Sequence, residues 1–429
     1  MLLSFLFALR LAASDGVKHA TVDIVPRSGG AIGVSSDRST IESPFLFTHV
    51  GMKWLTRGDS ACAPDLRTSA DGQVWGEWTS VRESSDLADE GDWRYSGLLS
   101  GAEARFVQVR IACDTAAAAP IEQLTLFFID PGKSLPEKRE IVASNHDETP
   151  SIIARGEWGC PEGADAPGWP PAHAAVSHLI VHHTDGASAA ADWSAEVRAI
   201  WVFHTISRGW GDIGYNLLID PLGRIYEGRA GGVGAIGAHF SCRNTGTAGV
   251  ALLGNYVSSL PTPEALDALA RVLAWLSSVH ELDAREIAFH APSALQMARI
   301  SGHRDGNLSS ATCSRTACPG DALYAFLPEL RLRVGDLAAH PLCAIESFEP
   351  ASGAIGATVT IRGANFIEVS RVDFNGAEAS FEVISATEIR AIVPAGARSG
   401  VISVTTPVDR GVSTGRFTVV GNRRRAARP

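Results

Sequence analysis

Residues with the chemistry of metal ligands gather in the middle of the sequence. His182 lies at the end of an apolar run (HLIVHH), His303 lies in the run GHRD, and Cys318 lies in the run TACPGD. Two imidazoles and one thiolate form a common open zinc site, in which water takes the fourth position. These ligand types suit zinc better than magnesium or calcium, and bound zinc lowers the pKa of its water toward ~7. Taken alone, a strand-end histidine is more often structural, and a cysteine before Pro-Gly is more often half of a disulfide.

The surrounding residues predict the elements that hold these side chains, within an α/β domain over residues 151–335. Apolar runs predict buried strands at 178–184 and 248–256, and two strands joined by a Pro-Leu-Gly turn at 215–228. Residues 262–282 predict a helix, because a threonine can cap it and four leucines recur at helical spacing. Strands that alternate with helices indicate a central mixed sheet with helices packed on it.

All-β patterns flank this domain on both sides. Residues 18–132 contain short strand-like runs such as FVQVRIAC (106–113), which predict an N-terminal antiparallel β-sandwich. Cys62 and Cys113 lie within it and could pair. Three tryptophans there could form a sugar-stacking face, or could pack at the core or edge: Trp75, Trp78 and Trp93. A polar segment with two prolines, residues 133–150, predicts a linker to the central domain.

Residues 344–420 return to strand patterns in which apolar and polar residues alternate. The runs FEPASGAIGATVTIRGANF, VDFNG and IVPAGARSGVISVTT resemble the IPT/TIG family, and this resemblance covers essentially the whole segment. It implies a C-terminal Ig-like β-sandwich. In that family such a module usually mediates adhesion or spacing rather than chemistry.

The totals and the chain ends limit the classes of function. The sequence has 429 residues, 45% of them hydrophobic and 20% charged, which indicates several globular domains. The net charge of −10 argues against a nucleic-acid partner, and the arginine-rich residues 421–429 predict a solvated basic tail. Residues 1–15 combine an apolar run with small residues, which predicts a signal peptide and a secreted, periplasmic or cell-surface protein; a first strand is the alternative. No other run approaches the length of a transmembrane segment.

The central segment resembles the peptidoglycan recognition proteins, which are type-2 N-acetylmuramoyl-L-alanine amidases related to phage T7 lysozyme. The resemblance spans residues 151–333 and rests on the order of the runs HLIVHHTDG, WGDIGYNLLID, AGVALLGNY, SGHRD and TACPGD. It implies that Zn2+ is held by the first histidine of VHHT, the histidine of GHRD and the cysteine of CPG, which are His182, His303 and Cys318. Family members that only bind often carry serine at the cysteine position, so Cys318 favours a hydrolase.

The same resemblance assigns further site residues. The tyrosine of DIGYN, Tyr215, is expected beside the zinc water as a donor to an oxyanion, and Thr316 takes the place of a lysine found in the phage enzymes. The candidate substrate-groove residues are His183, Thr184, His204, Trp210, His239 and Asn244. Sheet packing is the alternative for Trp210, and a surface or capping role is the alternative for His204.

The implied reaction is hydrolysis of the amide bond between the lactyl group of N-acetylmuramic acid and L-alanine in peptidoglycan. A recognition protein that binds muropeptides without turnover is one alternative, and an adhesin-like surface protein is another. In each case the flanking β domains are expected to bind a cell wall or a surface.

The spacing between His303 and the ligand cysteine departs from the family, because several extra residues separate them. Cys313 would lie nearer the usual spacing, but residues 316–321 carry the family's T-x-C-P-G-D pattern, which favours Cys318. The chain has seven cysteines, so we expect one zinc thiolate and three disulfides. The available partners of Cys313 are Cys160, Cys242 and Cys343.

Overall fold

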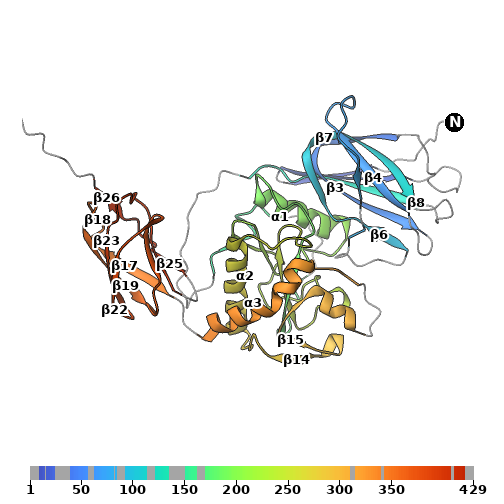
Figure 1. Ribbon diagram of the computed structural model, residues 1–429. Coiled ribbons are helices and arrows are strands. Elements are labelled where there is room, and N and C mark those ends of the chain that lie inside the picture. Colours follow the sequence, from blue (N-terminus) through green and yellow to red (C-terminus); the bar gives the residue numbers. More distant parts are fainter. Residues whose placement is uncertain are drawn as a thin grey trace, which may run out of the picture. The chain divides into compact units, whose positions relative to one another are not determined.

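The computed structural model describes most of the chain, and Figure 1 shows its elements coloured in chain order. The described residues are 9–14, 16–24, 39–56, 62–81, 83–84, 92–113, 121–134, 150–161, 170–309, 315–339, 343–406 and 410–420. Most of the predicted linker, the basic tail, residues 1–8 and Cys313 lie outside them. In the described part of the chain, no helix is both long and apolar enough to cross a membrane.

Contacts divide the chain into two compact units. The first contains Met1–Glu137, Ile153–Leu269 and Arg285–Pro328, and the second contains Lys138–Ile152, Ala270–Ala284 and Glu329–Pro429. The N-terminal strands and most of the central region therefore belong to one unit, although the sequence predicted them as separate domains. The C-terminal strands belong to the other unit.

The N-terminal region is rich in β-strands, as predicted. Its strands are β1 (Leu9–Ser14), β2 (Val17–Ile24), β3 (Ser39–Thr56), β4 (Cys62–Ser69), β5 (Thr79–Ser80), β6 (Trp93–Tyr95), β7 (Leu99–Cys113) and β8 (Ile121–Asp130). They form one sheet in the order β1-β2-β8-β3-β7-β4-β5, with β6 paired to β3. The long strand β3 pairs with β7 along its first part and with β8 along its second part.

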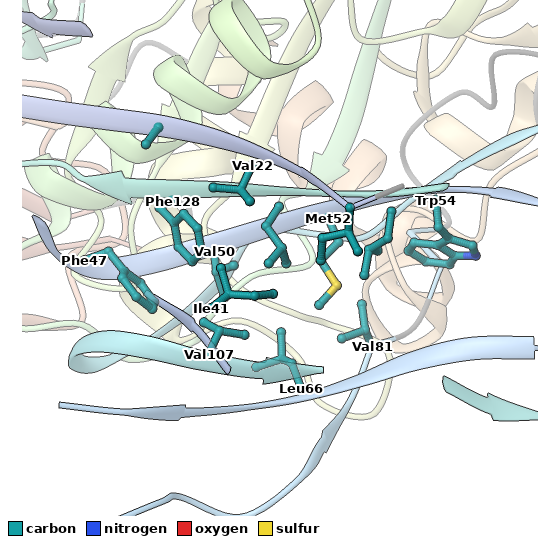
Figure 2. Close-up of a cluster of buried hydrophobic side chains, with 14 of the residues drawn as sticks. Val22, Ile41, Phe47, Val50, Met52, Trp54, Leu66, Val81, Val107 and Phe128 are labelled. Atoms are coloured by element: carbon teal, nitrogen blue, oxygen red, sulfur yellow. The ribbon is translucent and has the colours of Figure 1, made fainter. Parts of the chain in front are cut away.

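Apolar side chains of this sheet gather in a buried cluster between its strands, as Figure 2 shows. Met52, Val107 and Phe128 in this cluster are fully buried. Strand β2 buries alternate side chains, which is the period expected of a strand with one face toward a core. The predicted pair of Cys62 and Cys113 is confirmed as a disulfide, which joins directly opposed residues of β4 and β7.

The three tryptophans of the sugar-stacking hypothesis are half-buried in the N-terminal region. The guanidinium of Arg67 lies over Trp75 and Trp78, 5.2 and 4.7 Å from their ring centroids. The ammonium of Lys53 lies 4.6 Å from the ring centroid of Trp93. Each ring is therefore in contact with a cation of the protein itself, which favours the packing interpretation.

The central region contains strands, helices and short helical turns in alternation. These are β9 (Ile152–Ile153), β10 (His178–His183), α1 (Trp193–Val202), the π-helix η1 (Phe203–Ser207), β11 (Leu217–Ile219), β12 (Ile225–Glu227), η2 (Ser241–Arg243), β13 (Thr247–Leu252), α2 (Pro263–Val279), β14 (Ile287–His290), η3 (Ala291–Ser293), β15 (Leu295–Ala298), β16 (Ile300–Gly302), η4 (His303–Leu308) and α3 (Asp321–Ala339). The strands and the helix predicted from the sequence are confirmed.

Six of these strands form a mixed sheet in the order β16-β10-β13-β11-β12-β9. Strand β10 pairs in parallel with both β13 and β16, and β11 pairs antiparallel with β12. All six side chains of β10 are buried, as expected of a central strand with both faces covered. Because β10 and β16 are parallel, their carboxyl ends lie at the same edge of the sheet. The polar residues at that edge form the site described below.

The C-terminal region is all-β, as predicted. Its strands are β17 (Ala344–Glu349), β18 (Ser352–Gly353), β19 (Thr358–Ala364), β20 (Arg371–Phe374), β21 (Ala377–Glu378), β22 (Phe381–Ser385), β23 (Glu388–Ile392), β24 (Ile402–Thr405), β25 (Arg410–Val412) and β26 (Thr418–Val419). Two four-stranded sheets, β17-β19-β23-β22 and β21-β20-β24-β25, contribute to one buried core. This arrangement is that of a small Ig-like module.

Candidate metal centre and its surroundings

The three predicted ligands lie together in the interior. The ligand atoms of His182, His303 and Cys318 lie within 4.8 Å of one another, and all three side chains are buried. Sγ of Cys318 is 3.5 Å from Nδ1 of His182, and the rings of His182 and His303 are 4.7 Å apart. Two imidazoles and one thiol in this proximity are the donor set of a zinc site with one open position.

Strand register brings the two histidines together. His182 lies near the carboxyl end of β10, and His303 follows β16 directly as the first residue of η4. Strands β10 and β16 pair in parallel with Val181 opposite Gly302, so the residue that follows each of these two is a predicted ligand. Because neighbouring strands are about 4.8 Å apart, both imidazoles can reach one point.

Hydrogen bonds hold the cysteine loop against the second histidine. The backbone N–H of Arg304 donates to the carbonyl of Cys318 at 2.9 Å, and its guanidinium pairs with Asp321 at 2.6 Å. The amide of Asn307 donates to the carbonyl of Thr316 at 2.8 Å, and its Oδ1 accepts from the N–H of Thr316 at 3.0 Å. The GHRD and TACPGD motifs therefore form one structural unit. Sequence reasoning missed Asn307, whose only signal is its place in the run GHRDGN.

A third histidine contacts the first predicted ligand. Nε2 of His182 is 3.0 Å from Nδ1 of His239, while Nδ1 of His182 lies toward Cys318. His239 is 3% exposed, and its Nε2 is 3.4 Å from the hydroxyl of Thr247. Metal-bound histidines usually place their second ring nitrogen on such a partner, which fixes the ring orientation. This placement favours an orienting role for His239 over the predicted substrate contact.

The electrostatics of the cluster favour neutral histidines. Burial lowers the pKa of His182 well below its usual value, and charge on His303 or His239 would lower it further. Burial also lowers the pKa of His239 to about 3, with a contribution from His303 and then from Arg229. Neutral imidazoles offer the lone pairs that a metal ion needs, so these residues fit Zn2+.

Aromatic residues adjoin the cluster on one side. The ring of Tyr215 is 5.3 Å from that of His182 and 5.5 Å from that of His204. The ring of Trp210 packs on His204 at 4.7 Å. His204 is 4% exposed and its Nδ1 accepts from the N–H of Gly214 at 3.2 Å, so it is not a surface histidine. Burial, followed by the charges of two neighbouring arginines, lowers the pKa of His204 to about 3.

His183 turns away from the ligand cluster. Successive side chains of a strand point to opposite faces, so His183 and its neighbour His182 cannot face the same space. Nδ1 of His183 accepts a hydrogen bond from the N–H of Tyr256 at 3.2 Å, and the side chain is 1% exposed. This placement argues against the predicted substrate contact at His183. Its backbone N–H instead donates to Sγ of Cys318 at 3.4 Å, which is a contact to the ligand itself.

Three further predicted site residues accept hydrogen bonds from the backbone of the loops around the cluster. The hydroxyl of Thr316 accepts from the N–H of Cys318 at 2.9 Å, and the hydroxyl of Thr184 accepts from the N–H of Gly254 at 3.0 Å. Oδ1 of Asn244 accepts from the N–H groups of the two residues that precede η2, at 2.7 Å each. These bonds give all three residues a role in loop structure, and the predicted contacts with substrate stay predictions.

The prediction of three disulfides is wrong. The disulfide-bonded cysteines among the described residues are Cys62, Cys113 and Cys242, whereas Cys160 and Cys343 are thiols, like Cys318. Cys343 is 2% exposed within the core of the C-terminal strands, and Cys160 packs on the buried cluster around α1. A thiol packed against apolar side chains behaves as a small apolar residue, so packing accounts for both residues without oxidation.

Comparison with known proteins identifies the family of this chain. The profile of the family described as N-acetylmuramoyl-L-alanine amidase matches residues 172–321, and the IPT/TIG domain profile matches residues 344–419. The chain is 31% identical over 183 residues to peptidoglycan-recognition protein SD of Drosophila simulans. The aligned region covers 42% of this chain and 84% of that protein. The chain therefore belongs to the peptidoglycan recognition protein family, with a central domain of the amidase type and a C-terminal IPT/TIG domain.

Two other similarities concern the same central region. The chain is 33% identical over 182 residues to the N-acetylmuramoyl-L-alanine amidase of Sus scrofa. The aligned region covers 42% of this chain but only 27% of that protein. The alignment with the crystal structure of Drosophila peptidoglycan recognition protein SD covers 42% of this chain and 95% of that chain. The sequence identity is 29% and the TM-score is 0.34. The chain thus spans well under half of the pig amidase.

Proposed function

We propose that this protein is a zinc-dependent N-acetylmuramoyl-L-alanine amidase. Its substrate is the amide bond between the lactyl group of N-acetylmuramic acid and L-alanine in peptidoglycan. The observation that carries the proposal is the buried cluster of His182, His303 and Cys318, in which a thiol completes a hydrolytic donor set. These three residues would hold Zn2+, and bound Zn2+ supplies Lewis acidity and a water of lowered pKa.

The other residues of the site bind, orient and donate. The hydroxyl of Tyr215 donates to the substrate carbonyl oxygen as that oxygen gains negative charge, which stabilises the tetrahedral intermediate. His239 accepts from Nε2 of His182 and so holds the ligand ring in one orientation. The hydroxyl of Thr316 accepts from Cys318, and its own proton remains to donate to water or substrate. The packed rings of His204 and Trp210 contact the substrate at the side of Tyr215.

The proposed substrate places the protein outside the cytoplasmic membrane, as a secreted, periplasmic or cell-surface enzyme. Residues 9–14 of the proposed signal peptide form strand β1, which pairs along its whole length with β2. Signal cleavage would therefore remove an edge strand of the N-terminal sheet. We also propose that the N-terminal region is a β-sandwich, and that it and the IPT/TIG domain hold the enzyme on the wall or surface.

Release of dye from labelled, purified cell walls tests the activity. Wild type is expected to release dye, a chelator is expected to abolish the release, and added Zn2+ is expected to restore it. Mass spectrometry of the products should show new amino-terminal L-alanine. The absence of metal-dependent release on walls of every stem-peptide type would refute the amidase and favour a protein that only binds peptidoglycan.

Cys318→Ser tests the ligand assignment. The variant is expected to lose both bound zinc and turnover, because a serine hydroxyl is a much poorer zinc ligand than a thiolate. Cys343→Ser is the matched control, since it also replaces a buried thiol and lies in the core of the C-terminal strands. The control should keep its zinc and its activity. Unchanged zinc content in Cys318→Ser would show that the assignment is wrong.

A further inference from the structure

A row of stacked side chains connects the N-terminal sheet with the aromatic side of the candidate site. The guanidinium of Arg208 lies 3.5 Å from the ring centroid of Tyr95, which is the last residue of β6 and is 3% exposed. The same guanidinium lies 5.1 Å from the ring centroid of Trp210. Trp210 packs on His204, and His204 packs on Tyr215. A cation between two aromatic rings stabilises both contacts.

The segment that carries His204 meets the N-terminal sheet at a second point. Phe203, the first residue of the π-helix η1, is 2% exposed, and its ring lies 6.2 Å from that of Phe127 in β8. Gly51 of β3 leaves room for this ring, because a Cβ atom there would lie 2.6 Å from Cε2 of Phe203. π-Helical turns occur frequently at functional sites. His204 follows Phe203 directly, so its position depends on this contact.

Hydrogen bonds attach α1 to the same N-terminal region. Nε2 of His49 in β3 is 3.1 Å from Oε2 of Glu196 in the first turn of α1. The backbone N–H and the hydroxyl of Ser134, which follows β8, donate to the carboxylate of Asp192 at 2.9 and 2.7 Å. Asp192 is the residue that caps α1. The helix that leads into η1 is therefore held at its amino-terminal end by the N-terminal region.

We propose that the N-terminal β domain is a positioning part of the substrate groove, in which Tyr95 acts through Arg208 to hold Trp210 and His204 against the substrate. This inference rests on the proposed amidase function. Tyr95 and Arg208 are positioning residues, because they act through the rings of their neighbours. Tyr215 has a separate support, since its carbonyl accepts from the N–H of Arg229 at 2.8 Å. Loss of Tyr95 is therefore expected to weaken substrate binding more than the chemical step.

Steady-state kinetics and calorimetry with N-acetylmuramoyl-tripeptide test this division in the full chain. Tyr95→Ala is expected to raise KM and Kd about tenfold, because a cation–π contact and the packing of a buried aromatic ring are lost. We expect kcat to stay within about twofold of wild type and the zinc content to be unchanged. Tyr95→Phe keeps the ring over Arg208 and should restore KM and Kd to within about twofold of wild type.

Two further variants separate the proposed role from general loosening of the sheet. Gly51→Ala places a methyl group against Phe203 and is expected to raise KM and Kd in the same way as Tyr95→Ala. Phe106→Ala is the matched control, because it truncates a half-buried aromatic residue of the same sheet. Its ring lies beside the turn at Gly72, where an added Cβ atom would be 3.5 Å from it. The control should bind and cleave the muramyl peptide as wild type does.

The outcomes that would overturn the inference are specific. KM and Kd within about twofold of wild type in Tyr95→Ala, or in Gly51→Ala if the first variant does not fold, would refute it. An equal rise in Phe106→Ala would also refute it, because loosening of the sheet would then explain the effect. If wild type does not cleave the peptide at all, the amidase proposal fails, and the Kd values alone still decide the role of Tyr95.

Discussion

Replacement of His239 tests whether the metal centre depends on a residue that supplies no ligand atom. In the structure, Nδ1 of His239 is 3.0 Å from Nε2 of His182 and the ring is almost completely buried. The ring is also closely packed, because a Cβ atom at Gly249 would lie 2.5 Å from it. His239→Ala therefore removes the acceptor for the proton of His182 and leaves a space where the ring was.

The expected magnitude follows from this one hydrogen bond. A buried hydrogen bond to a group that carries charge contributes about 1.5–3 kcal/mol, and an imidazole bound to Zn2+ carries part of the charge of the ion. Every 1.4 kcal/mol is tenfold in affinity, so His239→Ala should weaken zinc binding about 10- to 100-fold. His239→Asn should lose less, because its Oδ1 is attached to Cγ as Nδ1 is in histidine. His239→Gln should lose as much as alanine, because its acceptor lies one bond further out.

Competition with a chromogenic chelator at neutral pH measures these affinities without any need for substrate. His290→Asn is the control, because His290 is another buried histidine, whose ring contacts Ser293 at 2.9 Å and the carbonyl of Thr245 at 3.0 Å. The control should lower stability and leave zinc affinity unchanged. Zinc affinity of His239→Ala within about twofold of wild type would refute the orienting role, since a lost support must cost more than that. An equal loss in all three His239 variants would refute the geometric argument for Nδ1.

The remaining predictions concern the proposed oxyanion donor and the dependence of stability on pH. Tyr215→Phe removes one donor, so kcat should fall about 10²- to 10³-fold with zinc content unchanged, and a kcat within about threefold of wild type would contradict the assignment. Burial and the charge of His290 lower the pKa of His178 to about 4, so between about pH 6.5 and 4 only the unfolded state binds this proton. Falling pH in that range should therefore destabilise wild type by up to about 3 kcal/mol relative to His178→Gln. Urea unfolding of both proteins at about pH 7 and pH 4.5 measures this difference. Equal losses of stability in the two proteins would contradict the lowered pKa.

The sequence by itself determined which three residues form the candidate metal site and most of the secondary structure around them. His182, His303 and Cys318 were identified because short motifs carry both the ligand type and its local backbone context. The strands around 178–184 and 248–256 and the helix around 262–282 were predictable because apolar periodicity is a local property of the chain. The pair Cys62 and Cys113 was also predicted correctly, within a region that the sequence already assigned to strands.

Only the tertiary structure decided how these parts support one another. Residues far apart in the chain decide the contact of His239 with His182 and the turn of His183 toward Tyr256. They also decide that Cys160 and Cys343 pack as thiols. The contact of Tyr95 with Arg208 depends on two regions that the sequence predicted as separate domains. Local patterns specify which face of a strand or helix is apolar, but they do not specify which other face covers it, because that choice is made by shape and packing across the whole fold.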